Sequence, residues 1–165
     1  MSNPNSVAAR SDEPAVRDWS ADQDIVLRLW ATLSRCHATC AKAMAAQVQE
    51  YDLTTPQFVV LEALHHLGSL SLGELAEKLL VTGGNVTYVM DRLEERGLVS
   101  RYRRPDDRRV VLARLTPSGR RLISEVFPNH VSRMEHLSRY LTSSEQKELA
   151  RLLKKMGTGI RQHDL

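Results

Sequence analysis

Apolar residues recur at every third or fourth position from Asp22 to about Gln49, with polar residues between them. This spacing places the apolar side chains on one face of an α-helix, so it predicts one long amphipathic helix. A helix of this length extends beyond a small core and usually packs against a partner along much of its length. That partner could be a second subunit. The apolar stripe consists of Ile25, Val26, Leu29, Trp30, Leu33, Cys36, Cys40, Met44 and Val48.

Two shorter helices are predicted next. Thr55 and Pro56 have the form of an N-cap followed by proline at the first helical position, and Gly68 ends this second helix. Ser71 and Glu74 have the spacing of a capping box, which begins a third helix of about nine residues. The residues expected on the buried side of the second helix are Phe58, Leu61, Leu64 and His65.

A fourth helix begins at Thr82, after a turn at Val81, and ends at Gly97. The segment 99–115 then predicts a two-stranded hairpin. Two short helices joined by a tight turn, the second followed by a basic hairpin, are typical of a winged helix-turn-helix. The predicted fold is therefore mainly α with a small β-wing. The expected core residues of the fourth helix are Val86, Val89, Met90 and Leu93.

Two further helices are predicted after the hairpin. Thr116 and Pro117 repeat the cap-plus-proline form, and Thr142 and Glu145 make a second capping box. Pro128 interrupts the first of these helices, and because proline lacks a backbone donor, we expect a kink or a break just before it. Their apolar stripes are Leu122, Ile123, Val126, Val131, Met134, Leu137 and Leu141, and then Leu149, Leu152, Leu153, Met156 and Ile160.

Positive charge is concentrated in and after the hairpin. Residues 101–121 contain eight arginines and two acidic residues, a net charge of +6, whereas the whole chain carries only +3. Such local basicity is typical of a nucleic-acid interface. A solvated charged loop is the less favoured interpretation of the cluster, because nothing nearby neutralises it.

Length and composition set bounds on the class of protein. At 165 residues and 42% hydrophobic composition, the chain can bury a core as one domain or two small lobes. Residues 1–20 are polar without an apolar period, so we expect a flexible arm, with Trp19 as its anchor. No apolar run reaches the roughly 20 residues of a membrane span, and no signal peptide is recognisable, which predicts a cytoplasmic protein. No enzyme motif occurs, so neither catalysis nor a cofactor is expected.

The sequence resembles the MarR (multiple antibiotic resistance regulator) family of bacterial transcription factors. The resemblance covers most of the chain after the arm and rests above all on Asp91–Val99, Arg104–Arg109 and Leu115–Gly119. The segment Thr82–Val89 is most similar to the branch that responds to quinones and related aromatics. The resemblance implies a homodimer whose N- and C-terminal helices interlock, and a repressor that a small molecule or oxidant releases from DNA.

The exposed start of the fourth helix is the first candidate DNA contact. Asparagine and threonine side chains bind base edges or phosphates, and a threonine methyl can meet a thymine methyl. Gly83 and Gly84 are expected to let backbone amides approach a phosphate, and the alternative is that they merely make the turn. Arg92 is a further candidate on the same helix. The polar candidates are Thr82, Asn85, Thr87 and Tyr88.

The wing supplies the second candidate contact. Asp107 and Arg109 occupy the family's Asp-x-Arg positions, and the resemblance implies that the arginine enters the minor groove while the aspartate orients it. A narrow minor groove concentrates negative potential and attracts arginine. The other arginines are interpreted as phosphate contacts, which fix register and carry the salt dependence. They are Arg101, Arg103, Arg104 and Arg108.

The resemblance also implies an effector site where the dimerisation helices join the DNA-binding part. For any single candidate, ordinary core packing is the favoured interpretation. Cys36 and Cys40 share one helix face, and three interpretations stay open: buried packing thiols, a redox-sensing thiol, or a metal site completed by a histidine. The metal interpretation lacks a recognisable ligand spacing, so no metal is expected. The ligand-binding candidates are Trp30, Cys36, His37, Cys40, Met44, Phe58 and His65.

The expected organisation is a flexible arm (1–20), a dimerisation helix (21–54), a winged helix-turn-helix (55–115) and helices that complete the dimerisation region (116–165). The expected function is sequence-specific DNA binding by a homodimeric repressor, released from a pseudo-palindromic operator by a small aromatic or phenolic ligand or an oxidant. The expected partners are double-stranded DNA, a second copy of the chain and a small aromatic effector, with no membrane. The alternatives are a thiol-based redox sensor that uses Cys36 and Cys40, and a winged-helix module for protein contacts without a ligand response.

Overall fold

The computed structural model describes residues 19–79 and 83–163. The chain forms two compact units, one up to Ala38 and one from Thr39 onward, and each is described by itself. In the first unit, Ser20 and Gln23 cap the start of helix α1 (Ala21–Gln49) by exchanging hydrogen bonds of 2.7 and 3.3 Å. Trp19 Nε1 donates a hydrogen bond of 3.4 Å to Asp24 Oδ1, which ties this side chain to the first turn.

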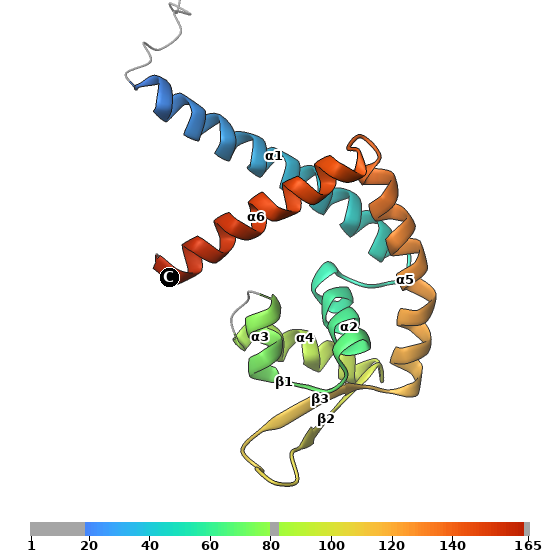
Figure 1. Ribbon diagram of the computed structural model, residues 1–165. Coiled ribbons are helices and arrows are strands. Elements are labelled where there is room, and N and C mark those ends of the chain that lie inside the picture. The colour runs from blue at the N-terminus through green and yellow to red at the C-terminus, as the bar shows by residue number, and fades with distance from the viewer. Residues whose placement is uncertain (1–18, 80–82, 164–165) are drawn as a thin grey trace, which may run out of the picture. The chain divides into compact units, whose positions relative to one another are not determined.

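The second unit combines helices with a small antiparallel sheet whose strands lie in the order β1, β3, β2. The β2–β3 hairpin projects beyond the helices α2, α3 and α4 (Figure 1). The predicted fold class, mainly α with a small β-wing, is confirmed. After the last turns of α1, the elements are α2 (Thr55–Leu67), β1 (Leu70–Ser71), α3 (Leu72–Leu79), α4 (Gly83–Glu95), β2 (Val99–Arg103), β3 (Val111–Leu115), α5 (Pro117–Ser138) and α6 (Ser143–His163).

The helix starts follow local caps, as the sequence predicts, with one correction. The cap of α2 is Thr54 rather than Thr55: its hydroxyl accepts a hydrogen bond from Gln57 N–H, and its own N–H donates to the Gln57 side chain at 2.9 Å. Only Thr54 stands three residues before a side chain that can close the capping box. The predicted boxes at Ser71 and Thr142 and the cap at Thr116 are all present.

Two features of the second unit differ from the sequence prediction. The hairpin is joined by a third strand, β1, in which Leu70 pairs with Ala113. Pro128 lies inside a continuous α5, so of the predicted kink or break the break does not occur. A missing N–H and a ring clash cost about 3 kcal/mol in a helix interior, and the buried side chains of Ile123 and Val126 beside the proline offset this cost. Val81 and Thr82, the expected turn and helix start, lie outside the described residues.

One hydrophobic core joins α2, α3, α4, the sheet and α5. The expected core residues Phe58, Leu61, Leu64, Val86, Met90 and Leu93 are buried, whereas Val89 and His65 are only partly buried. By contrast, no residue of α6 is buried, so its apolar stripe lies open in the single chain. No helix within residues 19–79 and 83–163 is long and apolar enough to cross a membrane.

The end of α4 and the start of α5 meet at one junction. Gly97 ends α4 with φ of +66°, a left-handed conformation that favours glycine. The Leu98 carbonyl accepts a hydrogen bond of 3.1 Å from Thr116 N–H, and the Thr116 hydroxyl donates to the Gly97 carbonyl at 2.6 Å. Gly119 lies against the same Leu98 carbonyl, because a Cβ atom at this position would stand 1.9 Å from the carbonyl oxygen. The junction therefore requires glycine at residue 119.

We predict that Gly119→Ala lowers the free energy of unfolding by about 1–3 kcal/mol or more, as overpacking does, because the obstructing atom belongs to the backbone. The control is Gly157→Ala on α6, where nothing lies within 4 Å of an added Cβ. That change should be neutral or stabilising by up to ~1 kcal/mol. Urea unfolding at one fixed protein concentration measures both variants, and equal stability of the two would contradict the proposed packing at the junction.

Candidate DNA-binding surface

Helix α4 presents a buried face and an exposed polar face. Val86, Met90 and Leu93 are buried at the spacing of one helical stripe. Asn85, Thr87, Tyr88 and Arg92 lie on the other side and are exposed, with 62% of Tyr88 accessible to solvent. Four of the candidate DNA contacts therefore share one accessible face of α4.

The first turn of α4 leaves the backbone accessible. Gly83 is the first helical residue, and outside the backbone of this helix no atom of the described residues lies within 4 Å of the position that a Cβ of Gly84 would occupy. Packing within the chain therefore does not require glycine at residue 84. Thr82, the remaining candidate from this turn, lies outside the described residues.

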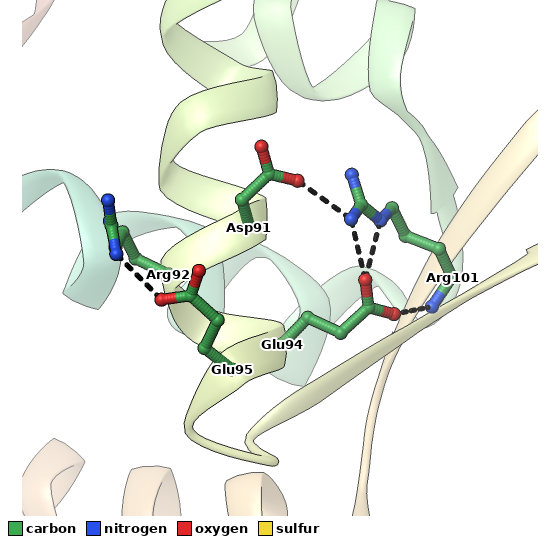
Figure 2. Close-up of polar contacts among 5 residues, drawn as sticks. All are labelled: Asp91, Arg92, Glu94, Glu95 and Arg101. Carbon is green, nitrogen blue, oxygen red and sulfur yellow. Dashed lines mark hydrogen bonds and ion pairs between the residues drawn. The ribbon is translucent and has the colours of Figure 1, made fainter.

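The Arg92 side chain is held along the surface of α4. Its guanidinium lies 5.3 Å from the centre of the Tyr88 ring, and Nη1 donates to Glu95 Oε2 at 2.8 Å (Figure 2). The bonds to Tyr88 and Glu95 raise the pKa of Arg92 above its already high ordinary value. Arg92 therefore stays charged, but the Glu95 carboxylate partly neutralises its charge.

Arg101 of β2 clamps the wing to α4. Figure 2 shows its guanidinium between two carboxylates of the helix, with Nη2 2.7 Å from Asp91 Oδ1 and 2.6 Å from Glu94 Oε2. Arg101 Nε donates to the same Glu94 oxygen at 2.8 Å, and the backbone N–H of Arg101 donates to Glu94 Oε1 at 2.9 Å. Because Glu94 binds both the backbone and the side chain of one residue, it fixes the direction in which β2 leaves the helix.

The clamp changes the role expected of Arg101. Only 27% of its side chain is accessible, and two carboxylates neutralise it. The expectation that nothing nearby neutralises the arginines is therefore wrong at this position, because Asp91 and Glu94 are brought to β2 by the turn at Gly97. The N–H and guanidinium of Arg101 also hold the pKa of Glu94 below its ordinary value.

Asp107 and Arg109 lie together at the tip of the wing. Asp107 Oδ1 accepts hydrogen bonds from the backbone N–H of Arg109 at 3.0 Å and from its Nε at 3.1 Å, and Oδ2 accepts from Nη2 at 3.3 Å. These bonds lower the pKa of Asp107. The Arg109 side chain is nevertheless 91% accessible, so the aspartate orients it without covering it.

The other wing arginines are less tightly held. Arg103 Nη1 donates to the Arg108 carbonyl at 2.6 Å, which braces the loop between the two strands. Arg104 Nε lies 3.9 Å from Asp106 Oδ1, a distant contact between exposed groups. Arg108 and Arg109 are both exposed. The wing tip thus keeps accessible positive charge, in contrast to Arg101 at its base.

The ligand-binding candidates are divided between the two units. Trp30, Cys36 and His37 belong to the first unit, whereas Cys40, Met44, Phe58 and His65 belong to the second. Phe58 is a core residue, and its ring centre lies 4.5 Å from that of His130. His130 Nδ1 lies 3.2 Å from Gln47 Oε1, so a buried polar contact joins the end of α1 to α5.

The two cysteines differ in environment. Cys36 is exposed, Cys40 is half-buried, and neither forms a disulfide. Within the single chain, Cys36 therefore does not meet the expectation of a buried packing thiol. The described parts of the chain contain no cluster of three or more His, Cys, Asp or Glu residues that could hold a metal ion.

Sequence reasoning missed Asp91 and Glu94 as positioning residues for the wing. Their signal is weak, because acidic residues near a helix end are common and their partner lies beyond a turn. It also missed an apolar cavity of about 580 Å³ beside α4, lined by the start of α2, Leu79 and residues including Val86 and Val89. The apolar stripe of α4 predicts that this helix packs into the core, but it does not indicate the cavity beside Val86 and Val89.

We predict that Glu94→Gln lowers the free energy of unfolding by about 1 kcal/mol at pH 7, a value reduced for partial exposure, because the amide cannot accept as strongly from Arg101. The folded-state pKa of Glu94 lies below the ordinary 4.5, so its contribution is complete above pH 4.5 and is lost as the pH falls through the lower value. The difference from the native protein should therefore shrink in acid.

Urea unfolding at a series of pH values from 7 downward measures this difference. The control is Glu148→Gln, which removes an exposed carboxylate paired with Arg151 on α6 and should change stability too little to resolve. A difference between native protein and Glu94→Gln that grows toward low pH would show that the clamp does not stabilise the fold.

Comparisons with known proteins agree with this geometry. The model of the MarR family matches residues 53–111. The HTH-type transcriptional regulator MhqR of Bacillus subtilis is 32% identical over 136 residues, which cover 82% of this chain and 94% of MhqR. A MarR variant from E. coli, solved in complex with operator DNA, has a TM-score of 0.74 at 27% identity and covers 84% of this chain and 99% of its own.

A second solved structure is that of BpsR from Bordetella bronchiseptica, described in terms of regulation of its DNA binding by 6-hydroxynicotinic acid. It has a TM-score of 0.72 at 31% identity and covers 79% of this chain and 98% of its own. Similarity in sequence and in fold thus extends over most of the described chain. The chain belongs to the MarR family of transcriptional regulators, which are DNA-binding proteins rather than enzymes.

Proposed function

We propose that the protein is a homodimeric repressor that binds a pseudo-palindromic operator and is released by a small aromatic molecule or an oxidant. The observation that carries this proposal is the exposed polar face of α4, held by the Arg101 clamp beside a wing with accessible arginines. A helix that offers hydrogen-bonding side chains next to a positively charged hairpin matches the major groove and the adjacent minor groove of one duplex.

In this proposal, the first half of α4 enters the major groove. Asn85 and Thr87 offer donors and acceptors for base edges, and Tyr88 and Arg92 extend the same face. Gly83 and Gly84 let the first backbone amides approach a phosphate. The open space beside Gly84 supports this role, because packing within the chain does not require its glycine.

The wing tip reaches the minor groove through Arg109, which Asp107 orients. Arg103, Arg104 and Arg108 bind phosphates. Arg101 has a different role: with two carboxylates on its guanidinium, it positions the wing and contributes little to the attraction of DNA. Two-fold symmetry then places the two half-sites about one helical turn apart, ~34–36 Å.

We predict that Arg109→Ala weakens binding to the operator by about five- to 150-fold for each half-site, the range for losing a specific contact of 1–3 kcal/mol. Arg103→Ala and Arg104→Ala should mainly flatten the dependence of affinity on salt, by about 0.9 per phosphate contact. Gel-shift titrations with the genomic DNA that flanks the coding sequence, at several salt concentrations, measure both effects. Unchanged affinity of Arg109→Ala would contradict the placement of the wing.

The dimer is proposed to form through α1 and α6. In the single chain, the stripe of α6 is open, with Leu149, Leu152 and Leu153 each more than a third accessible. Ile25 and Leu29 of α1 are also exposed. Apolar stripes of this length rarely face water in a stable protein, and a second copy of the chain offers the same stripes in return.

We predict a mass of two chains for the native protein and of one chain for the double variant Leu149→Glu and Leu153→Glu, because two carboxylates cannot be buried in an apolar interface. Light scattering coupled to size-exclusion chromatography measures the mass. The control is Gln146→Glu and Lys147→Glu, which adds acidic charge to exposed polar positions near the start of α6. A measured mass of one chain for the native protein would contradict the proposed dimer.

The effector is proposed to be a small aromatic or phenolic molecule. The resemblance of the Thr82–Val89 segment to the quinone-responsive branch supports this class, as does the regulation of BpsR by 6-hydroxynicotinic acid. The alternative signal is an oxidant acting on Cys36, whose exposure favours it over Cys40. Adding phenols, quinones or peroxide to the preformed DNA complex tests both, and a complex that survives all three would exclude them.

A further inference from the structure

A second basic surface lies at the base of the wing, away from its tip. Here the outer face of the sheet and the first turns of α5 enclose an open hollow of about 910 Å³. None of the described residues that line it is acidic. Its polar lining consists of Ser100, Arg114, Thr116, Arg120, Arg121 and Ser124.

The pleat of the sheet separates this surface from the Arg101 clamp. Arg101 pairs with Ala113 and Ser100 pairs with Arg114, so Arg101 and Arg114 point to opposite faces. The inner arginine is neutralised by Asp91 and Glu94. The outer one has only neutral contacts: Arg114 Nε donates to Ser100 Oγ at 3.2 Å, and its guanidinium lies 5.0 Å from the centre of the Tyr102 ring.

The first turns of α5 add two more cations to the same hollow. Arg120 and Arg121 are exposed, and Arg121 Nη2 donates to the neutral Ser118 hydroxyl at 3.0 Å. Neither they nor Arg114 form an ion pair with any carboxylate of the described residues. Three like charges around one hollow repel each other, and a ligand that carries several negative charges would remove that repulsion.

We propose that this hollow binds backbone phosphates of DNA that lies outside the segment contacted by α4 and the wing tip. This inference rests on the proposed function and extends its DNA contact along the duplex. Its volume exceeds that of a single phosphate group, and three arginines around one hollow suit several phosphates better than one anion. Strand β3 also runs from the loop at the wing tip and carries Arg114, so the basic surface continues from the proposed minor-groove contact.

The test is a triple variant, Arg114→Ala, Arg120→Ala and Arg121→Ala. The matched control is Lys147→Ala, Lys154→Ala and Lys155→Ala, which removes the same charge from exposed positions on α6. Hydroxyl-radical footprinting on the genomic duplex shows which sugar–phosphate positions each protein protects. Gel-shift titrations over a range of salt concentrations give the slope of affinity against salt.

We expect the triple variant to lose protection at the outer edges of the footprint while keeping the inner positions. Its salt slope should fall by about 5, at about 0.9 for each of the phosphate contacts that the two subunits of the proposed dimer lose, whereas the control keeps both footprint and slope. Replacing the three arginines by lysine should restore most of the slope, because the interaction depends on charge. Since Arg114 also contacts Ser100 and Tyr102, this lysine variant separates a charge effect from a folding defect.

An unchanged footprint and slope in the triple variant would overturn the inference while leaving the proposed function intact. Failure of the native protein to bind any duplex would contradict both the inference and the proposed function. A third outcome concerns the source of the phosphate. If calorimetry detects binding of inorganic phosphate to the native protein that the triple variant lacks, and the footprints are identical, the hollow binds free anions and the inference is wrong.

Discussion

The contact between Gly119 and the Leu98 carbonyl is the constraint on which the DNA-binding part depends. The turn between α4 and β2 meets the turn between β3 and α5 at this point. The Leu98 carbonyl accepts a hydrogen bond from the Thr116 N–H, and Gly119 packs against the same carbonyl. A side chain at residue 119 would force α5 away from this turn. The contact that fixes the end of α4, the wing and α5 relative to each other would then be lost.

The role of each arginine depends on which side of the strand it occupies. Arg101 and Arg114 belong to paired strands of one hairpin, yet the first faces two carboxylates of α4 and the second faces a hollow without acidic residues. Net charge alone therefore overstates the cations available to DNA, because one arginine of the cluster is used to hold the wing. The remaining arginines are distributed over two places. One is the wing tip, where Asp107 and the Arg108 carbonyl hold them, and the other is the hollow on the outer face of the wing base, whose described lining contains no acidic residue.

Sequence reasoning predicted the features that arise from local interactions. Capping boxes at Ser71 and Thr142, the glycine stops and the apolar stripes each involve residues within a few positions of each other, so their signal is present in the chain itself. It missed β1, because two residues are too few to show alternation and the strand exists only through its pairing with β3. It predicted a kink or a break at Pro128, and no break occurs because the buried contacts that sustain α5 come from other elements, which the local sequence does not show. The Asp107–Arg109 pair was expected from the family resemblance, whereas the Arg101 clamp depends on how the turn at Gly97 folds β2 back along α4.

The exposed stripe of α6 has a consequence for how such proteins can diverge. Its leucines add nothing to the core that supports α4 and the wing, since no residue of this helix is buried in the chain. In the proposed dimer, substitutions on α6 that follow a gene duplication would be constrained by the complementarity of one copy to another and hardly by the stability of the DNA-binding part. The two resulting proteins could thus keep the same operator preference while they cease to form mixed dimers. Two separate regulators could then evolve from one ancestral gene.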